Sequence, residues 1–167
     1  MRWVYRRSAR ATGWGTDVSD KRQRLQREAF GLFRTVPTRW GDNDVYGHVN
    51  NVVYYAWFDT AVNAWLVERG FLDIAGSATV GLVVETTCSY FESVAFPEAV
   101  EVGLGVERLG NSSVTYRIGV FREGGALAAA QGHFTHVYVD RATQRPVPIP
   151  ADLRAALEEL TSSGGSG

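Results

Sequence analysis

The sequence has a single cysteine, Cys88, and therefore cannot form an internal disulfide. A lone cysteine is typical of a protein in a reducing compartment, so we expect a cytoplasmic location. No apolar run approaches the ~20 residues that a membrane-spanning helix needs. The N-terminus is basic but lacks the apolar segment of a secretory signal. These absences predict a protein that has no membrane partner and is not exported.

A large excess of charge of one sign is also missing, because the net charge at pH 7 is -1. Nucleic-acid-binding domains usually carry a clear positive excess, so we expect no nucleic-acid partner. A chain of 167 residues has the length of one domain, and its 45% hydrophobic content is enough for a globular core.

The basic residues are unevenly distributed, since nine of the seventeen lie within residues 1–34. We interpret residues 1–30 as a basic, poorly ordered N-terminal extension with a short charged helix over residues 20–30. A phosphate-binding arm or an organelle-targeting segment is the functional alternative. Residues 31–161 then form the folded domain, and residues 162–167 form a flexible Gly/Ser tail.

Residues 39–51 concentrate acids, amides and a histidine. Gly41 and Gly47 interrupt regular structure there, which predicts a loop. Within ten positions this loop has Asp42, Asp44, His48, Asn50 and Asn51. Asp42 and the two asparagines have a purely structural alternative, as a turn residue and as helix caps. Burying a carboxylate and an imidazole beside a helix start is costly, which favours a functional role for Asp44 and His48.

A long helix is predicted directly after this loop. The stretch from Val52 to Arg69 contains no proline and no glycine, and its apolar residues cover nearly every helical face. That pattern predicts a helix buried all round. Asn50 is a natural N-cap, and Gly70 is placed where a helix ends. The loop would therefore bring a carboxylate and an imidazole to the positive end of a buried helix.

The loop and the helix resemble the hot-dog-fold thioesterases of the 4-hydroxybenzoyl-CoA thioesterase type. The resemblance lies in the Gly-Asp-x-Asp motif formed by residues 41–44, the turn at Gly47 and the aromatic-rich helix from Asn51. The segment His48–Asn51 is also similar to plant acyl-carrier-protein thioesterases and short-chain acyl-CoA thioesterases. The resemblance covers roughly residues 33–150. It implies an α+β hot-dog fold, in which an antiparallel five-stranded sheet wraps around one long buried helix.

The strand pattern agrees with this fold. Apolar residues alternate with polar or small ones most clearly from Val100 to Val106. Tight turns follow at residues 110–112 and 123–125. The predicted strands span residues 32–36, 79–91, 100–106, 114–120 and 126–140, and a short helix follows at residues 151–160. The resemblance also implies a homodimer, often paired to a homotetramer, with the site between protomers. The exposed edges of a five-stranded sheet give modest independent support.

The resemblance places Asp44 at the position of the catalytic aspartate. A thioester is cleaved by water, or by a carboxylate that forms a mixed anhydride, so Asp44 would be a general base or a nucleophile. Amide groups near Asn51 and Val52 would hold the carbonyl oxygen. This chemistry needs neither a metal nor another cofactor.

Three further residues are candidates for the site. His48 could orient water or protonate the departing thiolate, or it could simply bond a loop carbonyl. Tyr46 stands where the plant enzymes have the asparagine of Asp-x-Asn-x-His, and we predict that it contacts the substrate. Glu85 lies in an otherwise apolar strand, and it could be a base, a partner of His48 or part of a salt bridge. His133 and His136 point to opposite faces of one strand, so they are not expected to bind a metal together.

The substrate is predicted to be an acyl-CoA or an acyl-carrier-protein thioester, with the acyl group left open. The family enzyme has several basic residues in the turn that corresponds to residues 107–113, whereas this turn has Arg108 alone. A carrier-protein substrate, or phosphate contacts made elsewhere, becomes more credible for that reason. The alternatives are an acyl-thioester-binding module without turnover and, less favoured, a hot-dog hydratase or dehydratase.

Overall fold

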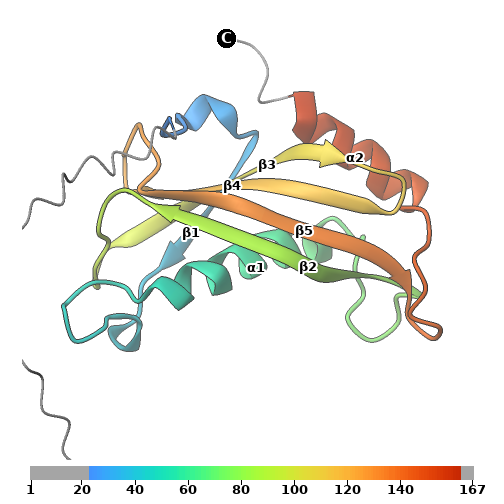
Figure 1. Cartoon of the computed structure of the whole chain (residues 1–167), viewed down its shortest axis with the longest axis horizontal. Coiled ribbons are helices and arrows are strands. Elements are labelled where there is room, and N and C mark those ends of the chain that lie inside the picture. The colour runs from blue at the N-terminus through green and yellow to red at the C-terminus, as the bar shows by residue number, and fades with distance from the viewer. Residues whose placement is uncertain (1–22, 163–167) are drawn as a thin grey trace, which may run out of the picture.

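The computed structural model describes residues 23–162, which form one five-stranded sheet curved around a long helix (Figure 1). Neighbouring strands are antiparallel, and their order across the sheet is β1-β3-β4-β5-β2. This arrangement confirms the predicted hot-dog fold. The elements are β1 (Leu32–Pro37), α1 (Asn51–Glu68), β2 (Thr79–Tyr90), β3 (Ala99–Leu109), β4 (Ser113–Arg122), β5 (Ala130–Asp140) and α2 (Ala151–Ser162). Two short 3₁₀ turns, η1 (Arg27–Ala29) and η2 (Trp40–Asp42), flank β1.

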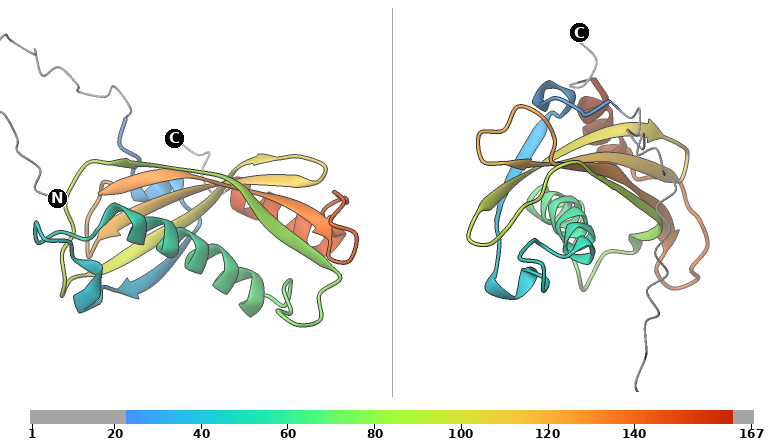
Figure 2. Two further views of the ribbon diagram at one scale, coloured as in Figure 1. Left: turned by 60° about the horizontal axis from the view of Figure 1, so that its bottom comes forward. Right: turned by 60° about the vertical axis from the view of Figure 1, so that its left-hand side comes forward.

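Alternation along the strands sets the two faces of the sheet. In β3 the side chains of Val100, Val102 and Leu104 are buried in the main core, which also contains the buried side chains of α1. Figure 2 shows α1 nearly end-on in its right-hand view, with the curved sheet arching over it. We call this the inner face of the sheet and the opposite one the outer face.

Helix α1 is buried along one face and not all round. Its buried side chains recur at intervals of three and four residues, which is one stripe of a helix. They are Tyr54, Trp57, Phe58, Ala61, Val62, Trp65 and Leu66. Val52 and Val67 remain exposed on the helix, so the prediction of burial on every side is wrong for a single chain. Hydrophobic composition alone does not distinguish a chain's own core from a surface that a second chain covers.

The structure places residues 23–30, which we call the N-terminal strap, on the outer face. The amide of Arg27 donates to the carbonyl of Ala126, and the amide of Ala128 donates to the carbonyl of Leu25. Only Arg27–Ala29 is helical, as a single 3₁₀ turn, so the predicted helix is wrong for this part of the chain. The packed domain therefore includes the strap, while residues 1–22 of the predicted extension lie outside the described residues, as do residues 163–167 of the tail.

Phe30 anchors the end of the strap in a small outer cluster with Phe121 and Ala128. Two glycines leave room for its ring: a Cβ atom at Gly103 would lie 2.8 Å from Phe30 Cγ, and one at Gly119 would lie 2.6 Å from Phe30 Cζ. Since a larger side chain at either position would displace the ring, these strands are shaped to receive the strap.

The β2 strand is an edge of the sheet and is unusually exposed. Among the described strands it pairs with β5 alone, and a bulge between Val83 and Glu85 interrupts its register. Three successive large apolar side chains, Leu82, Val83 and Val84, are exposed there. Within residues 23–162, no helix is both long and apolar enough to cross a membrane.

Candidate active site

The polar loop between β1 and α1 closes on itself through buried contacts. Asp42 is 2% exposed, and its carboxylate accepts bonds from the backbone amide of Arg39 at 2.7 Å and from its Nε at 3.0 Å. The carbonyl of Asp42 accepts from the amide of Asn50 at 2.8 Å. Asn43 Oδ1 accepts from the amide of Phe96 at 3.0 Å, which ties the loop to the β2–β3 connection. Asp42 therefore has the structural role that the sequence left open.

Asp44 holds the tip of the loop with one of its two carboxylate oxygens. Oδ1 accepts from the amide of Tyr46 at 2.8 Å and, at 3.5 Å, from that of His48. Gly47 completes the turn with a φ of 81°, a left-handed conformation that glycine adopts without strain. Within the described residues, Oδ2 of Asp44 and the imidazole ring of His48 form no hydrogen bond. The turn thus fixes the carboxylate and leaves its second oxygen available.

The start of α1 places an unpaired backbone N–H group near Asp44 and His48. Asn50 is the N-cap, as predicted, and its side chain accepts from the amide of Val52 at 3.2 Å. The carbonyl of Asn50 accepts from the amide of Val53 at 3.0 Å. The amide of Asn51 has no acceptor among residues 23–162, and it lies at the positive end of the helix. The cap uses the Val52 amide that we expected at the substrate, whereas the Asn51 amide is free.

These groups line one pocket of about 360 Å³ at the N-terminal end of α1. The loop contributes Asp44 and His48, and the helix contributes Asn51. The end of β2 and the residues after it form the facing wall. The full lining is Asp44, His48, Val49, Asn51, Tyr54, Tyr90, Phe91, Glu92 and Ser93.

Two tyrosines, Tyr54 and Tyr90, line this pocket. The hydroxyl of Tyr90 donates to the carbonyl of Asn51 at 3.2 Å, which fixes the end of β2 against the helix start. The Tyr54 ring meets the Tyr90 ring edge-on, with 5.1 Å between centroids. Burial raises the pKa of Tyr54 to about 12, and burial also raises the pKa of Tyr90. The Tyr90 hydroxyl acts as a donor, and its bond joins the two walls of the pocket.

The structure brings together three of the predicted site residues, Asp44, His48 and Asn51, and separates the others. Tyr46 lies at the loop tip, with 82% of its surface exposed, and does not line the pocket. The Val52 side chain is 62% exposed. Glu85 lies in β2 opposite Thr135 of β5, exposed and outside the pocket lining.

Sequence reasoning missed the facing wall of the pocket. Tyr90, Glu92 and Ser93 enter the site because the end of β2 meets the start of α1, and no local pattern predicts that meeting. The nearest signal was the end of the predicted strand at residue 91, which places Tyr90 at an end of the sheet. That signal does not indicate which end of the helix Tyr90 contacts.

A larger cavity of about 400 Å³ lies between β1 and α1, far along the helix from the loop. It is lined by Leu32, Trp65 and Val102 among others, and its one acid, Glu68, is paired to Arg34 at 2.5 Å. No histidine or cysteine lines it. Its chemistry is therefore poorer than that of the pocket at the helix start, which holds a free carboxylate oxygen and a free amide.

The histidines of β5 point to opposite faces, as predicted. His133 is exposed on the outer face, and His136 is 1% exposed on the inner face. Across the described part of the chain, no group of three or more His, Cys, Asp or Glu side chains is arranged to hold a metal ion.

Comparisons with known proteins agree with this fold. The model of the thioesterase-like superfamily matches residues 38–157. The chain is similar to the PA5185 protein from Pseudomonas aeruginosa strain PAO1, with 54% identity, coverage of 87% of this chain and 100% of that one, and a TM-score of 0.82. It is also similar to the BH1999 gentisyl-coenzyme A thioesterase, with 25% identity, coverage of 74% and 99%, and a TM-score of 0.66.

Among curated proteins, the chain matches the uncharacterized protein YsmA from Bacillus subtilis (strain 168). The two are 24% identical over 87 residues, which is 52% of this chain. The match spans 58% of the length of YsmA.

Proposed function

Because the chain belongs to the thioesterase-like superfamily, we propose that it hydrolyses an acyl thioester of coenzyme A or of an acyl carrier protein. Asp44 is the proposed nucleophile or general base. The observation that carries this proposal is the shared pocket in which Asp44 Oδ2 and the Asn51 amide are both unpaired among the described residues. A carboxylate for the carbonyl carbon and a donor for the carbonyl oxygen are the two groups that thioester cleavage needs.

Two routes use these groups. In one, Asp44 Oδ2 attacks the carbonyl carbon, the carbon–sulfur bond breaks, and water then opens the mixed anhydride. In the other, Asp44 takes a proton from a water molecule that attacks the carbon directly. In both, the Asn51 amide donates to the oxygen as negative charge develops on it. The departing thiolate takes a proton from His48 or from solvent, and the products are a free acid and a thiol.

The printed name of one similar protein supports a coenzyme A thioester as the substrate. The BH1999 protein is named a gentisyl-coenzyme A thioesterase. We do not propose the gentisyl group as the acyl group of this chain's substrate, because the aromatic residues of α1 are mostly buried in the core and do not define an acyl pocket.

We also propose a homodimer or a homotetramer. Tyr46 and Val52 at the loop and helix start, and the exposed β2 edge, present apolar surface that a second copy would cover. In such an assembly, Tyr46, Val52 and Glu85 would contact substrate at the interface. Light scattering should give two or four times the chain mass of 18.4 kDa, whereas the mass of one chain would contradict the assembly.

Substitution of Asp44 tests the catalytic assignment. Asp44→Asn keeps an oxygen for the turn but removes the charge, and we expect hydrolysis of a panel of acyl-CoA esters to fall by about 10²- to 10⁴-fold. Asp44→Ala should lose as much. Asp59→Asn is the matched control, because Asp59 is exposed on α1 and, among residues 23–162, its side chain bonds Asn63 alone. Circular dichroism checks that each variant folds.

The outcomes separate the proposal from its rivals. Wild-type rates in Asp44→Asn across the panel would remove Asp44 from the mechanism. Tight acyl-CoA binding by the wild-type protein without thiol release would indicate a binding module. Hydration of an enoyl-CoA without hydrolysis would indicate a hydratase.

A further inference from the structure

The N-terminal strap carries one arginine to the wall of the proposed active site. Arg24 NH2 lies 2.6 Å from Glu92 Oε1. The same guanidinium lies over the ring of Phe91, 5.7 Å from its centroid. Phe91 and Glu92 both line the pocket that contains Asp44. A positive charge from a segment that is distant in sequence therefore lies at the edge of the pocket.

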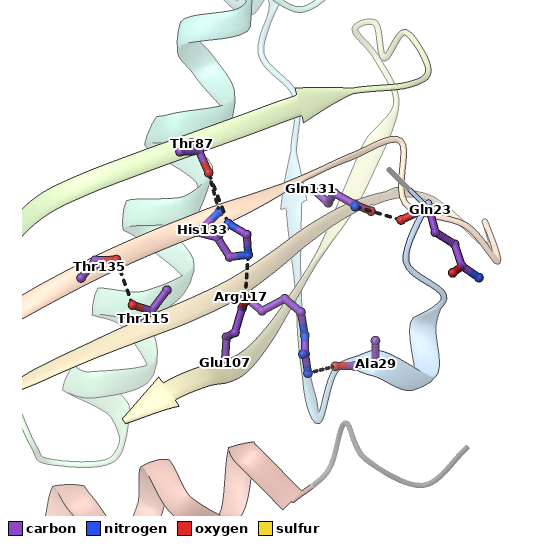
Figure 3. Close-up of polar contacts among 9 residues, drawn as sticks. All are labelled: Gln23, Ala29, Thr87, Glu107, Thr115, Arg117, Gln131, His133 and Thr135. Atoms are coloured by element: carbon purple, nitrogen blue, oxygen red, sulfur yellow. Dashed lines mark hydrogen bonds and ion pairs between the residues drawn. The ribbon is translucent and has the colours of Figure 1, made fainter. Parts of the chain in front are cut away.

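The strap is fixed on both sides of Arg24. Gln131 of β5 clamps it: its side-chain oxygen accepts from the amide of Leu25 at 2.7 Å, and its Nε2 donates to the carbonyl of Gln23 at 3.2 Å. Figure 3 shows the contact between Gln131 and Gln23 and, further along the strap, the bond from Arg117 to the carbonyl of Ala29. Arg24 Nε also donates to the carbonyl of Ala128 at 3.0 Å. Only the tip of the arginine is therefore free to change partners.

Among residues 23–162, the pocket lining includes two carboxylates, Asp44 and Glu92, and contains neither lysine nor arginine. Within this part of the chain, Arg24 is therefore the guanidinium that lies beside the pocket. Arg108 of β3 pairs with Thr115 of β4, which pairs with Thr135 of β5. Tyr90 of β2 pairs with Ala130, which is five residues earlier on β5. At ~3.4 Å per residue, Arg108 is about 17 Å further along the sheet. The turn that supplies basic residues in the family enzyme is thus remote from this pocket within the chain.

We propose that Arg24 binds the phosphate of the phosphopantetheine group that carries the acyl thioester. This inference rests on the proposed thioesterase function. A guanidinium binds phosphate oxygens with strong charge-assisted hydrogen bonds. At present the NH2 group of Arg24 contacts one carboxylate oxygen of Glu92. Glu92 orients Arg24 when the pocket is empty and competes with phosphate when the substrate arrives. The shared ligand chemistry is a phosphopantetheine phosphate, supplied by coenzyme A or by a carrier protein.

Thioesters with and without phosphate test this role. For Arg24→Gln, we expect the KM for an acyl-CoA to rise about three- to fivefold, as is typical of one partly exposed charge contact, with kcat unchanged. The KM for the same acyl group on N-acetylcysteamine, which has no phosphate, should not change. Arg122→Gln is the matched control, because Arg122 Nε pairs with Glu98 Oε2 at 2.7 Å and lies outside the pocket lining.

Substitution of Glu92 should change the KM for acyl-CoA in the opposite direction. Glu92→Gln frees Arg24 from its partner, so the KM for acyl-CoA should fall. The double variant should behave like Arg24→Gln. The difference between Arg24→Gln and the wild type should shrink at high ionic strength, because salt screens partly exposed charges. A fall in thermal stability without these opposite KM changes would assign the ion pair a purely structural role and overturn the proposal.

A third substrate, the same acyl group on a phosphopantetheinylated carrier protein, identifies the source of the phosphate. A KM raised for acyl-CoA alone assigns the contact to coenzyme A, a KM raised for the carrier alone assigns it to the carrier, and a KM raised for both assigns it to the phosphate that they share. Equal changes for all three thioesters, or none, would overturn the proposal. If the wild type hydrolyses no thioester, the proposed function fails, and calorimetric titration of coenzyme A and of the phosphopantetheinylated carrier into wild type and Arg24→Gln decides the inference independently. Weaker binding of either ligand by Arg24→Gln would support it, and equal or absent binding of both would overturn it.

Discussion

Two histidines three residues apart on β5 show how differently the two faces of the sheet are built. On the outer face, His133 Nε2 pairs with Glu107 Oε2 at 2.5 Å, and its backbone amide donates to Thr87 Oγ1 at 3.2 Å (Figure 3). On the inner face, both ring nitrogens of His136 lack a hydrogen-bond partner within the described part of the chain. Its ring packs against Phe134, with 5.0 Å between centroids.

The difference shows where the free energy of folding arises. The inner face excludes water, so apolar burial is strongly stabilising there and an unpaired polar group is costly. On the outer face the ion-paired side chains are partly exposed, so each ion pair contributes little and the strap is held by many small contacts. The N-terminal strap can therefore contact charged groups of the substrate without disturbing the core.

The largest expected effect comes from truncating matched phenylalanines on the two faces. Phe58 is fully buried between α1 and the sheet, whereas Phe30 belongs to the small outer cluster. We expect Phe58→Ala to lower the free energy of unfolding by about 4 kcal/mol and Phe30→Ala by about 2 kcal/mol, because the strap can relax around its cavity. Urea denaturation measures both. An equal or larger loss for Phe30→Ala would show that the strap is part of the main core.

A smaller effect should appear in the pH dependence of stability. Burial lowers the pKa of His136 from its ordinary value of 6.5 to about 4. Between these values the unfolded state binds a proton that the folded state does not, so stability falls as the pH decreases from 6.5 to 4. The contribution of this group to that loss is about 3 kcal/mol. His136→Leu, which also removes two unpaired polar atoms, should flatten the curve in this window.

Thr135→Ser is the control for that measurement, because it changes the same strand, keeps the hydroxyl that bonds Thr115 and removes no titratable group. Urea midpoints at a series of pH values should give parallel curves for Thr135→Ser and the wild type. If the His136→Leu curve is parallel to both, the inner face is better hydrated than its burial indicates. The ring also limits its neighbour: a Cβ atom at Gly81 would lie 2.7 Å from His136 Nδ1.

The parts of the fold and site that could be predicted from the sequence depend on local chemistry. Asn50 caps a helix and Asp44 closes a turn because of residues within a few positions of them, and the strands follow from alternation. The positions of Tyr90 and Arg24 depend on contacts between segments that are distant in sequence. The strap was predicted to be poorly ordered because its basic composition is typical of exposed chain. The surface on which the strap packs forms only when β3 and β4 pair.

The smallest expected effect compares neighbouring positions on β2 that face opposite sides. Cys88 pairs with Gly132 on the inner face, and burial raises the pKa of its thiol to about 11. Thr87 pairs with His133 on the outer face. Since the thiolate is the reactive form, Cys88 should react with an aromatic disulfide reagent about tenfold more slowly than a cysteine introduced by Thr87→Cys in a Cys88→Ser background. In urea the two should react at similar rates. Equal rates in the folded protein would mean that water reaches both faces of this edge strand, and the contrast between the faces would then hold only for the central strands.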